Sequence, residues 1–277
     1  MSAHPTDARA GLPLTGERTV PGLPEENYWF RRHEVVYRHC VDICADREVL
    51  EAGCGEGYGA DLIAATARRV VAVDYDEATV SHVRARYPRV EVLAANLTAL
   101  PLPDQSVDVV VNFQVIEHLW DQPQFVAECL RVLRPGGRLL VSTPNRITFT
   151  PGSDTPVNPF HTRELNAAEL TDLLQAGGFE IEGMYGVFHG PRLAEMDARH
   201  GGSIIDAQIA RALADAPWPQ DLLDDVAAVR CEDFEIVGTD ARDINGVAAA
   251  ARDINGVAAA ARDINDSLDL LAIATRR

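Results

Sequence analysis

A glycine-rich stretch, VLEAGCGEGYGADL at residues 49–62, is the first place in this 277-residue chain where residue types and spacing indicate chemistry. The stretch predicts a buried strand, a tight turn and the start of a helix, an arrangement that usually receives a nucleotide. Its glycines are Gly53, Gly55, Gly57 and Gly59, so Tyr58 takes the place of the third glycine in a dinucleotide fingerprint. We therefore expect a nucleotide-like ligand other than NAD.

Two carboxylates flank this turn. Glu51 lies two residues before Gly53, where it can accept hydrogen bonds from a ligand ammonium group. Asp74 ends the next predicted strand, 21 residues after Gly53, and a carboxylate there can accept from both ribose hydroxyls. Glycine lets the backbone approach the ligand without a Cβ, and N–H groups at the start of the following helix can receive a ligand carboxylate.

The order acidic residue, one residue, then Gly-x-Gly-x-Gly resembles the glycine motif of class I S-adenosylmethionine (SAM) methyltransferases. The resemblance implies SAM as the methyl donor, with Asn96, in the place of a frequent Asp, at the adenine edge. Cys54 is expected to be a small residue tolerated in the turn rather than a reactive thiol. The expected donor-binding residues are Glu51, Gly53, Cys54, Gly55, Gly57, Asp74, Tyr75, Asn96, Leu97 and Gln114.

A second group of reactive residues, Gln114, Glu117 and His118, lies in NFQVIEHLWDQPQF at 112–125. Positions i, i+3 and i+4 share one helical face, so the three side chains can converge. The segment resembles the one after the fourth strand in ubiquinone-biosynthesis O-methyltransferases, where Glu-x-x-Glu-His can hold a divalent metal. Gln114 replaces the first Glu with a weaker, neutral ligand for Mg²⁺. The alternative to a metal site is that Glu117 caps the segment and His118 packs beneath it.

Methyl transfer to an alcohol also requires a base. The sulfonium is already a good donor, so alignment can supply most of the catalysis, but the hydroxyl proton must leave as the oxygen attacks. His118 and His161 are the candidate bases, and Glu117 is expected to orient a partner or a metal. His161 lies in VNPFHTREL, which is similar to an Asn-Pro-aromatic-His segment of methyltransferases that act on sugars and related metabolites. His189, in GVFHGPRL, is a third candidate on the acceptor side.

The elements that must position these residues alternate between strands and helices. Near-continuous Val, Leu and Ala in the strands indicates burial on both faces, which is typical of a parallel sheet covered by helices. We predict an α/β, Rossmann-like class I methyltransferase fold with seven strands, mostly parallel, and an antiparallel last strand at LDLLAIAT. The predicted divisions are a lid and helix segment (1–45), a SAM-binding core (46–190) and an acceptor-side segment (191–277) with the final strand.

The N-terminal stretch TGERTVPG followed by ENYWFRRHEVVY resembles the lid of methyltransferases found with polysaccharide enzymes. That resemblance implies sugar contacts, through ring stacking and hydrogen bonds, from Tyr28, Trp29, Arg31 and His33. The alternative is an amphipathic helix from Asn27 to about Cys44 that covers the sheet.

Over nearly its whole length the chain is similar to mycobacterial methyltransferases associated with methylglucose lipopolysaccharide (MGLP), a cytoplasmic α-glucan with methylated glucoses. The resemblance implies a SAM-dependent sugar O-methyltransferase that methylates a glucose hydroxyl, 3-O favoured over 6-O, on a precursor of that glucan. The expected partner is a glucose oligosaccharide or polysaccharide, and Mg²⁺ is a second expected cofactor. A small phenolic or lipid acceptor on the same fold is the alternative.

The net charge and the distribution of apolar residues exclude some classes of partner. A formal net charge of −17 repels phosphate backbones and anionic membranes, so we expect no nucleic-acid substrate. No apolar run approaches a bilayer span and the first residues lack an apolar signal core, which favours a cytoplasmic protein. A further alternative is a protein that binds the nucleotide without catalysis. The candidate catalytic residues Glu117, His118 and His161 argue against this alternative. The sequence specifies no oligomeric state.

A ten-residue unit, ARDINGVAAA, occurs at 241–250 and again at 251–260, and ARDIND begins a third copy. A ten-residue period is about 2.8 helical turns, so its apolar side chains would not stay on one helical face. We expect short helical pieces or a mobile loop, produced by tandem duplication in a tolerant surface connection rather than kept for binding.

Overall fold

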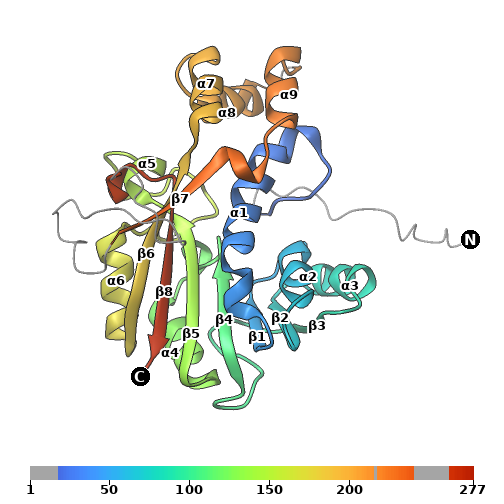
Figure 1. The fold of residues 1–277 in the computed structure, drawn as a ribbon, viewed down its shortest axis with the longest axis vertical. Helices are drawn as coiled ribbons and strands as arrows, with labels where there is room; N and C mark the ends of the chain where they lie inside the picture. Colours follow the sequence, from blue (N-terminus) through green and yellow to red (C-terminus); the bar gives the residue numbers. More distant parts are fainter. Residues whose placement is uncertain (1–17, 215–216, 240–261) are drawn as a thin grey trace, which may run out of the picture.

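The computed structural model describes residues 18–214, 217–239 and 262–277. Its centre is one sheet with the strand order β3-β2-β1-β4-β5-β8-β6-β7 (Figure 1). The strands are β1 (Glu48–Ala52), β2 (Arg69–Asp74), β3 (Glu91–Ala94), β4 (Val107–Phe113), β5 (Leu133–Pro144), β6 (Phe179–His189), β7 (Phe234–Thr239) and β8 (Asp269–Arg276). β1 to β5 pair in parallel, whereas β8 runs antiparallel between β5 and β6, and β7 runs antiparallel on the outer edge of β6.

Helices cover both faces of the sheet. The α-helices are α1 (Asn27–Cys44), α2 (Tyr58–Ala64), α3 (Glu77–Arg86), α4 (Gln122–Val132), α5 (Arg146–Phe149), α6 (Ala167–Ala176), α7 (Pro191–Arg199), α8 (Ile204–Ala214) and α9 (Gln220–Ala227). Short 3₁₀ turns are η1 (Pro24–Glu26), η2 (Ile116–His118), η3 (Cys231–Asp233) and η4 (Ile264–Asp266). Neighbouring residues of β1 show the two-sided core: Val49 packs with the α1, α2 and α3 side, and Leu50 with the α4 and α6 side.

The sheet has eight strands in the described part of the chain, so the prediction of seven was wrong by one. The additional strand is β7, whose sequence FEIVGT is short and lies at the sheet edge, where a continuous Val and Leu pattern is not required. The predicted antiparallel last strand is confirmed as β8. α1 matches the predicted helix at both ends.

The RPGG segment, residues 134–137, lies inside β5. α4 ends at Val132, and β5 already begins at Leu133. The pairing of β5 with β4 shifts register here, with Val107 opposite Leu133 and Val109 opposite Arg138. The segment is therefore an irregularity inside the strand, which Pro and Gly both favour.

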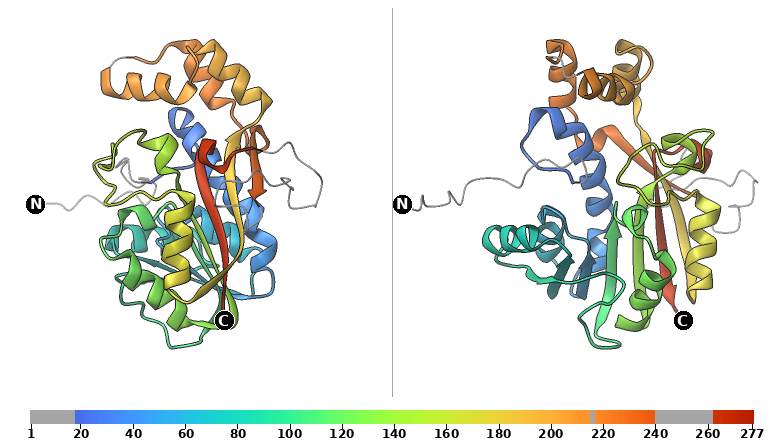
Figure 2. Two further views of the ribbon diagram at one scale, coloured as in Figure 1. Left: turned by 90° about the vertical axis from the view of Figure 1, so that its left-hand side faces the viewer. Right: turned by 180° about the vertical axis from the view of Figure 1, so that it is seen from behind.

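α7, α8 and α9 stand beyond the end of the sheet at which the parallel strands finish (Figures 1 and 2). Asn27, at the start of α1, holds the end of α9 by donating its side-chain amide to the carbonyls of Val226, Ala227 and Val229. The proposed divisions at 45/46 and 190/191 stay predictions, although residues 191–277 supply β7 and β8 to the same sheet. Within the described residues, every helix is too short or too polar to cross a bilayer. The full copies of the ten-residue repeat lie outside the described residues.

Candidate active site

The glycine turn follows β1 and runs into α2. Gly53, Gly55 and Gly57 all have positive φ angles, of 88°, 51° and 96°. A Cβ on Gly53 would meet the Val115 side chain at 2.6 Å, so that glycine is needed for packing against the segment after β4. A Cβ on Gly55 would meet, among the described residues within 4 Å, only Arg18 at 3.9 Å. Gly55 therefore leaves room beside the turn, and this is where a ligand can approach the backbone.

Asp74, at the end of β2, fixes the shape of this turn. Its Oδ2 accepts a hydrogen bond from the Gly55 backbone N–H at 3.0 Å, and its Oδ1 accepts from the Asp76 N–H at 3.1 Å. Each carboxylate oxygen keeps a further lone pair for another donor. Asp74 therefore lies beside Gly55 and has a backbone role that the spacing did not indicate, and its contact with the ribose stays a prediction.

Glu51, near the end of β1, is a buried carboxylate with an incomplete set of partners. Tyr37 of α1 donates its hydroxyl to Oε1 at 2.6 Å, while Oε2 is buried and has no hydrogen-bond partner among the described residues. Burial raises the pKa of Glu51 to about 8, the Tyr37 hydrogen bond opposes this shift, and the charge of Asp74 adds to it. A cationic ligand group would satisfy the free oxygen.

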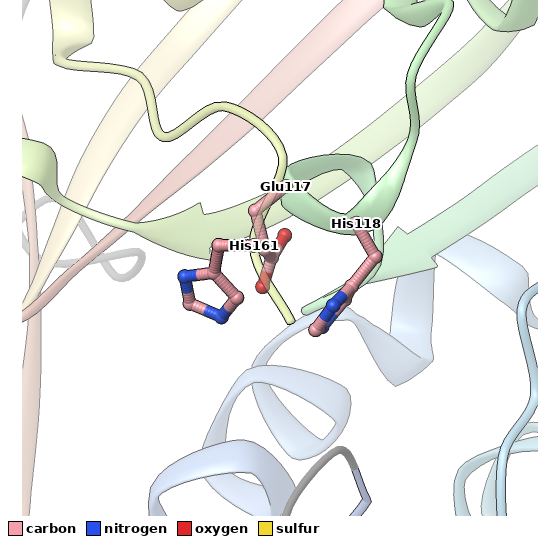
Figure 3. Close-up of side chains that lie close together, drawn as sticks. All are labelled: Glu117, His118 and His161. Carbon is pink, nitrogen blue, oxygen red and sulfur yellow. The ribbon is translucent and has the colours of Figure 1, made fainter. Parts of the chain in front are cut away.

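A second group of side chains comes together after the end of β4 (Figure 3). It consists of Glu117 and His118, which lie on η2, and His161, which lies on the loop after α5. One ligand atom from each side chain lies within 4.8 Å of the other two. The His118 and His161 rings meet edge to face, with centroids 4.9 Å apart. We call these three residues the Glu117 cluster.

The backbone of Glu117 holds the His161 loop in place. Its carbonyl accepts hydrogen bonds from the N–H groups of Thr162 at 2.7 Å and Arg163 at 3.2 Å. The Glu117 side chain is buried and accepts from the Thr143 hydroxyl of β5 at 3.0 Å. Burial raises the Glu117 pKa to about 7, an effect that His161 and Thr143 partly oppose. Glu117 thus joins η2 to the His161 loop through its backbone carbonyl and to β5 through its carboxylate.

Hydrogen bonds at Nδ1 orient both histidine rings. Nδ1 of His161 lies 2.7 Å from Oε1 of Glu164, and Nδ1 of His118 lies 3.0 Å from the Phe160 carbonyl oxygen. Because a carboxylate and a carbonyl only accept, Nδ1 carries the hydrogen in each ring and Nε2 keeps its lone pair. The Nε2 of His161 lies 3.0 Å from the side-chain nitrogen of Asn158.

Gln114 does not lie on one helical face with Glu117 and His118, which was the basis for expecting the three side chains to converge. η2 begins only at Ile116, and Gln114 precedes it with a φ of 57°, so the three residues do not share one helical face. The Gln114 amide nitrogen instead donates to the Ser142 hydroxyl at 3.1 Å. His161 takes the third position.

Comparison with known proteins identifies the family. A profile for the methyltransferase domain matches residues 50–141. The chain is 69% identical over 267 residues to a probable S-adenosylmethionine-dependent methyltransferase of Mycolicibacterium smegmatis, and the match covers 96% of each chain. This chain belongs to the SAM-dependent methyltransferases. A probable SAM-dependent methyltransferase of Mycobacterium tuberculosis is 66% identical over 273 residues, which are 98% of this methyltransferase and 92% of that protein.

Solved structures agree with the fold. A protein from Thermotoga maritima described as a SAM-dependent methyltransferase and possible histamine N-methyltransferase has a TM-score of 0.57. It shares 17% sequence identity, and the match covers 90% of this methyltransferase and 93% of that chain. The structural match, rather than the low sequence identity, shows that the two proteins share a Rossmann-like methyltransferase fold.

SAM fits the residues around the glycine turn. The partnerless Oε2 of Glu51 can take the ammonium of the methionine part, and the room beside Gly55 admits the ligand next to Asp74. Tyr75, the next residue, is 76% exposed. Cys54 is buried and burial raises its pKa well above the usual value, which leaves it a poor nucleophile.

The predicted adenine-side residues lie after β3. Asn96 is exposed, and its Oδ1 accepts from the N–H and the hydroxyl of Thr98, both at 2.9 Å. Leu97 is buried. Asn96 therefore has its acceptor oxygen directed into its own turn, and its role at adenine stays a prediction.

The predicted sugar contacts on α1 divide into two groups. Tyr28 is fully buried and bonds His189 Nε2 at 2.6 Å, and His189 Nδ1 lies 2.6 Å from Asp197 of α7. The expectation that Tyr28 contacts a sugar was wrong, because its ring has no exposed surface. His189 is partly exposed, and its place on the acceptor side stays a prediction. Trp29 is half-buried with Arg32 over its ring, and Arg31 pairs with Glu34.

His33 is the lid residue that faces the Glu117 cluster. Burial lowers its pKa to about 4, the charge of Asp269 opposes this, and the charges of Arg32 and His118 add to it. Its Nδ1 lies 3.5 Å from the Thr19 hydroxyl, which in turn lies 3.2 Å from the Tyr58 hydroxyl at the start of α2. His33 is therefore linked through Thr19 to the start of α2, and its charge interacts with that of His118 in the cluster.

Sequence reasoning missed several partners of the site residues. They are Tyr37 for Glu51, Thr143 for Glu117, and Asn158 and Glu164 for His161. For Glu164, the spacing in HTRE was a usable signal, because it places a carboxylate three residues after the histidine. Tyr37 and Thr143 lie on other elements, and the linear sequence carries no signal for those contacts.

Replacing Glu51 with Gln is expected to weaken SAM binding at least tenfold and to stabilise the ligand-free protein. Because the folded pKa of about 8 exceeds the ordinary 4.5, the folded state holds the proton that the unfolded state loses, and the free energy of unfolding falls as pH rises through that interval. Gln removes this penalty, which we expect to be roughly 1–3 kcal/mol at pH 8. SAM affinity of the parent should rise from pH 6 to pH 8, and that of Glu51→Gln should not.

Calorimetric titration of SAM and thermal unfolding, both at pH 6 and pH 8, check this. Tyr185→Phe, a change of a tyrosine on β6, is the control for nonspecific effects on the fold. Equal stability of parent and variant at pH 8, or an unchanged SAM affinity, would contradict the role of Glu51.

Proposed function

We propose that this methyltransferase methylates a sugar hydroxyl, a glucose 3-OH in preference to a 6-OH, on an α-glucan precursor of methylglucose lipopolysaccharide. The observation that carries the proposal is the Glu117 cluster, which follows Val115, the residue packed against Gly53 of the glycine turn. A sulfonium donor needs no help to release its methyl group, so a group of proton acceptors here serves the nucleophile. An alcohol is the nucleophile that most needs it.

His118 is the residue to which we assign the proton. SAM, when bound at the glycine turn, would supply the methyl group, and a C–O bond to the acceptor oxygen would form as the C–S bond breaks, with S-adenosylhomocysteine as the product. The hydroxyl proton passes to Nε2 of His118, whose Nδ1–H is held by the Phe160 carbonyl. Nε2 of His161 already receives the Asn158 amide, so His161 is the weaker candidate in the metal-free state.

The surroundings of the cluster support a polar, ring-shaped acceptor. Trp120, two residues after His118, is 91% exposed, and Phe160, directly before His161, is 45% exposed. Exposed aromatic rings beside polar side chains suit a sugar, whose faces are apolar and whose edges donate and accept. The similarity to probable SAM-dependent methyltransferases of mycobacteria is compatible with this acceptor. With such a substrate, we expect the reaction to take place in the cytoplasm.

The test is methyl transfer from labelled SAM to α-1,4-linked glucose oligomers, with the methylated position mapped by NMR. A 3-O-methyl glucose product is the expected result, and a 6-O product would change the position but keep the acceptor class. A catechol and a fatty acid serve as comparison acceptors. Transfer to one of these and none to the oligomers, with SAM binding intact, would replace the sugar proposal with the small phenolic or lipid alternative.

A further inference from the structure

The Glu117 cluster presents a set of donor atoms that can bind a metal ion. One ligand atom from a carboxylate and one from each of two imidazoles all lie within 4.8 Å of one another. In the described part of the chain, no other group of three or more His, Cys, Asp or Glu residues meets this criterion. Figure 3 shows the three side chains directed toward a common space between the η2 turn and the His161 loop. Three protein ligands with remaining positions open is the arrangement of many catalytic metal sites.

The hydrogen bonds behind the rings are those of a metal site. Metal-binding histidines usually donate the ring N–H that faces away from the ion to a carboxylate or a backbone carbonyl. His161 does so to Glu164 and His118 to the Phe160 carbonyl, at 2.7 and 3.0 Å. Both bonds leave Nε2 as the ligand atom. The Asn158 amide, which meets Nε2 of His161, must turn aside when an ion binds.

The charge around the cluster also favours a cation. Glu117 and Glu164 are both buried, and neither forms an ion pair with an arginine in the described ranges. Oε2 of Glu164 has no hydrogen-bond partner among those residues. Two buried carboxylates without a cationic partner carry a desolvation cost that a dication would offset.

We propose that Glu117, His118 and His161 bind a divalent first-row transition ion, with Glu164 positioning the His161 ring. Mg²⁺ requires oxygen ligands in near-octahedral geometry, whereas two imidazoles and one carboxylate suit Mn²⁺, Fe²⁺, Co²⁺ or Zn²⁺. The expected Mg²⁺ site at Gln114, Glu117 and His118 is thereby replaced in both ligands and metal. Such an ion, when bound, supplies a positive charge that makes a nearby hydroxyl easier to deprotonate.

Occupancy by an ion and proton transfer to His118 are alternative uses of the same nitrogen. In the loaded protein His118 is a ligand, and in the metal-free protein it is the base. The binding itself does not depend on which acceptor is methylated, so it can be tested without any acceptor.

The experiment is titration of Mn²⁺ into tag-free, chelator-treated protein, followed by electron paramagnetic resonance, in which free Mn²⁺ gives a sharp signal that binding removes. One equivalent should bind, and a tenfold excess of Mg²⁺ should not release it. His118→Ala, His161→Ala and Glu117→Gln should each weaken binding at least tenfold, and Glu164→Gln about tenfold. The control is His200→Asn, which removes a histidine paired with Asp225 at 2.8 Å and should leave Mn²⁺ affinity unchanged.

S-adenosylhomocysteine binding and circular dichroism establish that each variant is folded. Equal Mn²⁺ binding by the parent and the three ligand variants, no stoichiometric binding by the parent, or full release by Mg²⁺ would overturn the inference. Failure to methylate glucose oligomers would count against the proposed function and leave these binding data standing.

Discussion

His118→Ala, compared with the parent in metal-free protein, is expected to slow methyl transfer by a factor of about 10²–10⁴ while SAM affinity stays within about twofold of the parent. Nε2 of His118 is the free nitrogen of the Glu117 cluster, because Nδ1 is bonded to the Phe160 carbonyl. The ring contributes nothing to the glycine turn, where Gly55, Asp74 and Glu51 lie. The loss should therefore fall on the rate constant for transfer and not on donor binding.

Single-turnover kinetics with labelled SAM measure this loss, and calorimetry with S-adenosylhomocysteine measures donor binding. Added imidazole should restore part of the rate in metal-free His118→Ala, because a small base can occupy the space that the ring leaves. His39→Gln, a change on α1 where the ring packs against Tyr185, is the matched control. A rate within threefold of the parent would remove His118 from the chemistry.

The residues of the donor site could be predicted because they depend on local order. Glu51 and Asp74 lie near the carboxyl ends of the neighbouring parallel strands β1 and β2, and the glycine turn follows β1. Parallel strands bring their carboxyl ends to one edge of the sheet. The α1 helix could be predicted for a similar reason. Its buried side chains include Tyr28, Arg32, Val36, Cys40 and Cys44, which recur every four residues.

The Glu117 cluster could be predicted only in part. The sequence identified all three residues as candidates, but it paired Glu117 and His118 with the nearby Gln114. What brings His161 to the cluster is the hydrogen bonding of its loop to the Glu117 carbonyl, and backbone contacts of this kind leave no residue-type signal. The same limit applies to Tyr28 and His189, which are 161 positions apart and bond each other inside the protein.

Replacing Asp269 with Asn is expected to destabilise the protein by about 3–5 kcal/mol. Arg32 of α1 and Asp269 of β8 form a buried, two-pronged ion pair, with Nε to Oδ2 at 2.6 Å and Nη2 to Oδ1 at 2.7 Å. Asn removes the negative charge and leaves the buried guanidinium facing a neutral amide beside the Leu268 carbonyl. An unpaired buried charge is among the largest single penalties that a substitution can create.

The double variant Arg32→Met, Asp269→Leu separates this charge effect from packing. Removing both charges and filling the space with apolar side chains of similar volume should leave the protein more stable than either single variant. Urea unfolding followed by circular dichroism measures the four free energies of unfolding. Additive losses in the double variant would show that the two side chains act independently and would contradict the ion-pair explanation. α1 also carries His33, so loss of the Arg32–Asp269 pair should loosen the helix that holds this ring. The single variants should therefore transfer methyl groups more slowly, even at temperatures where they remain folded.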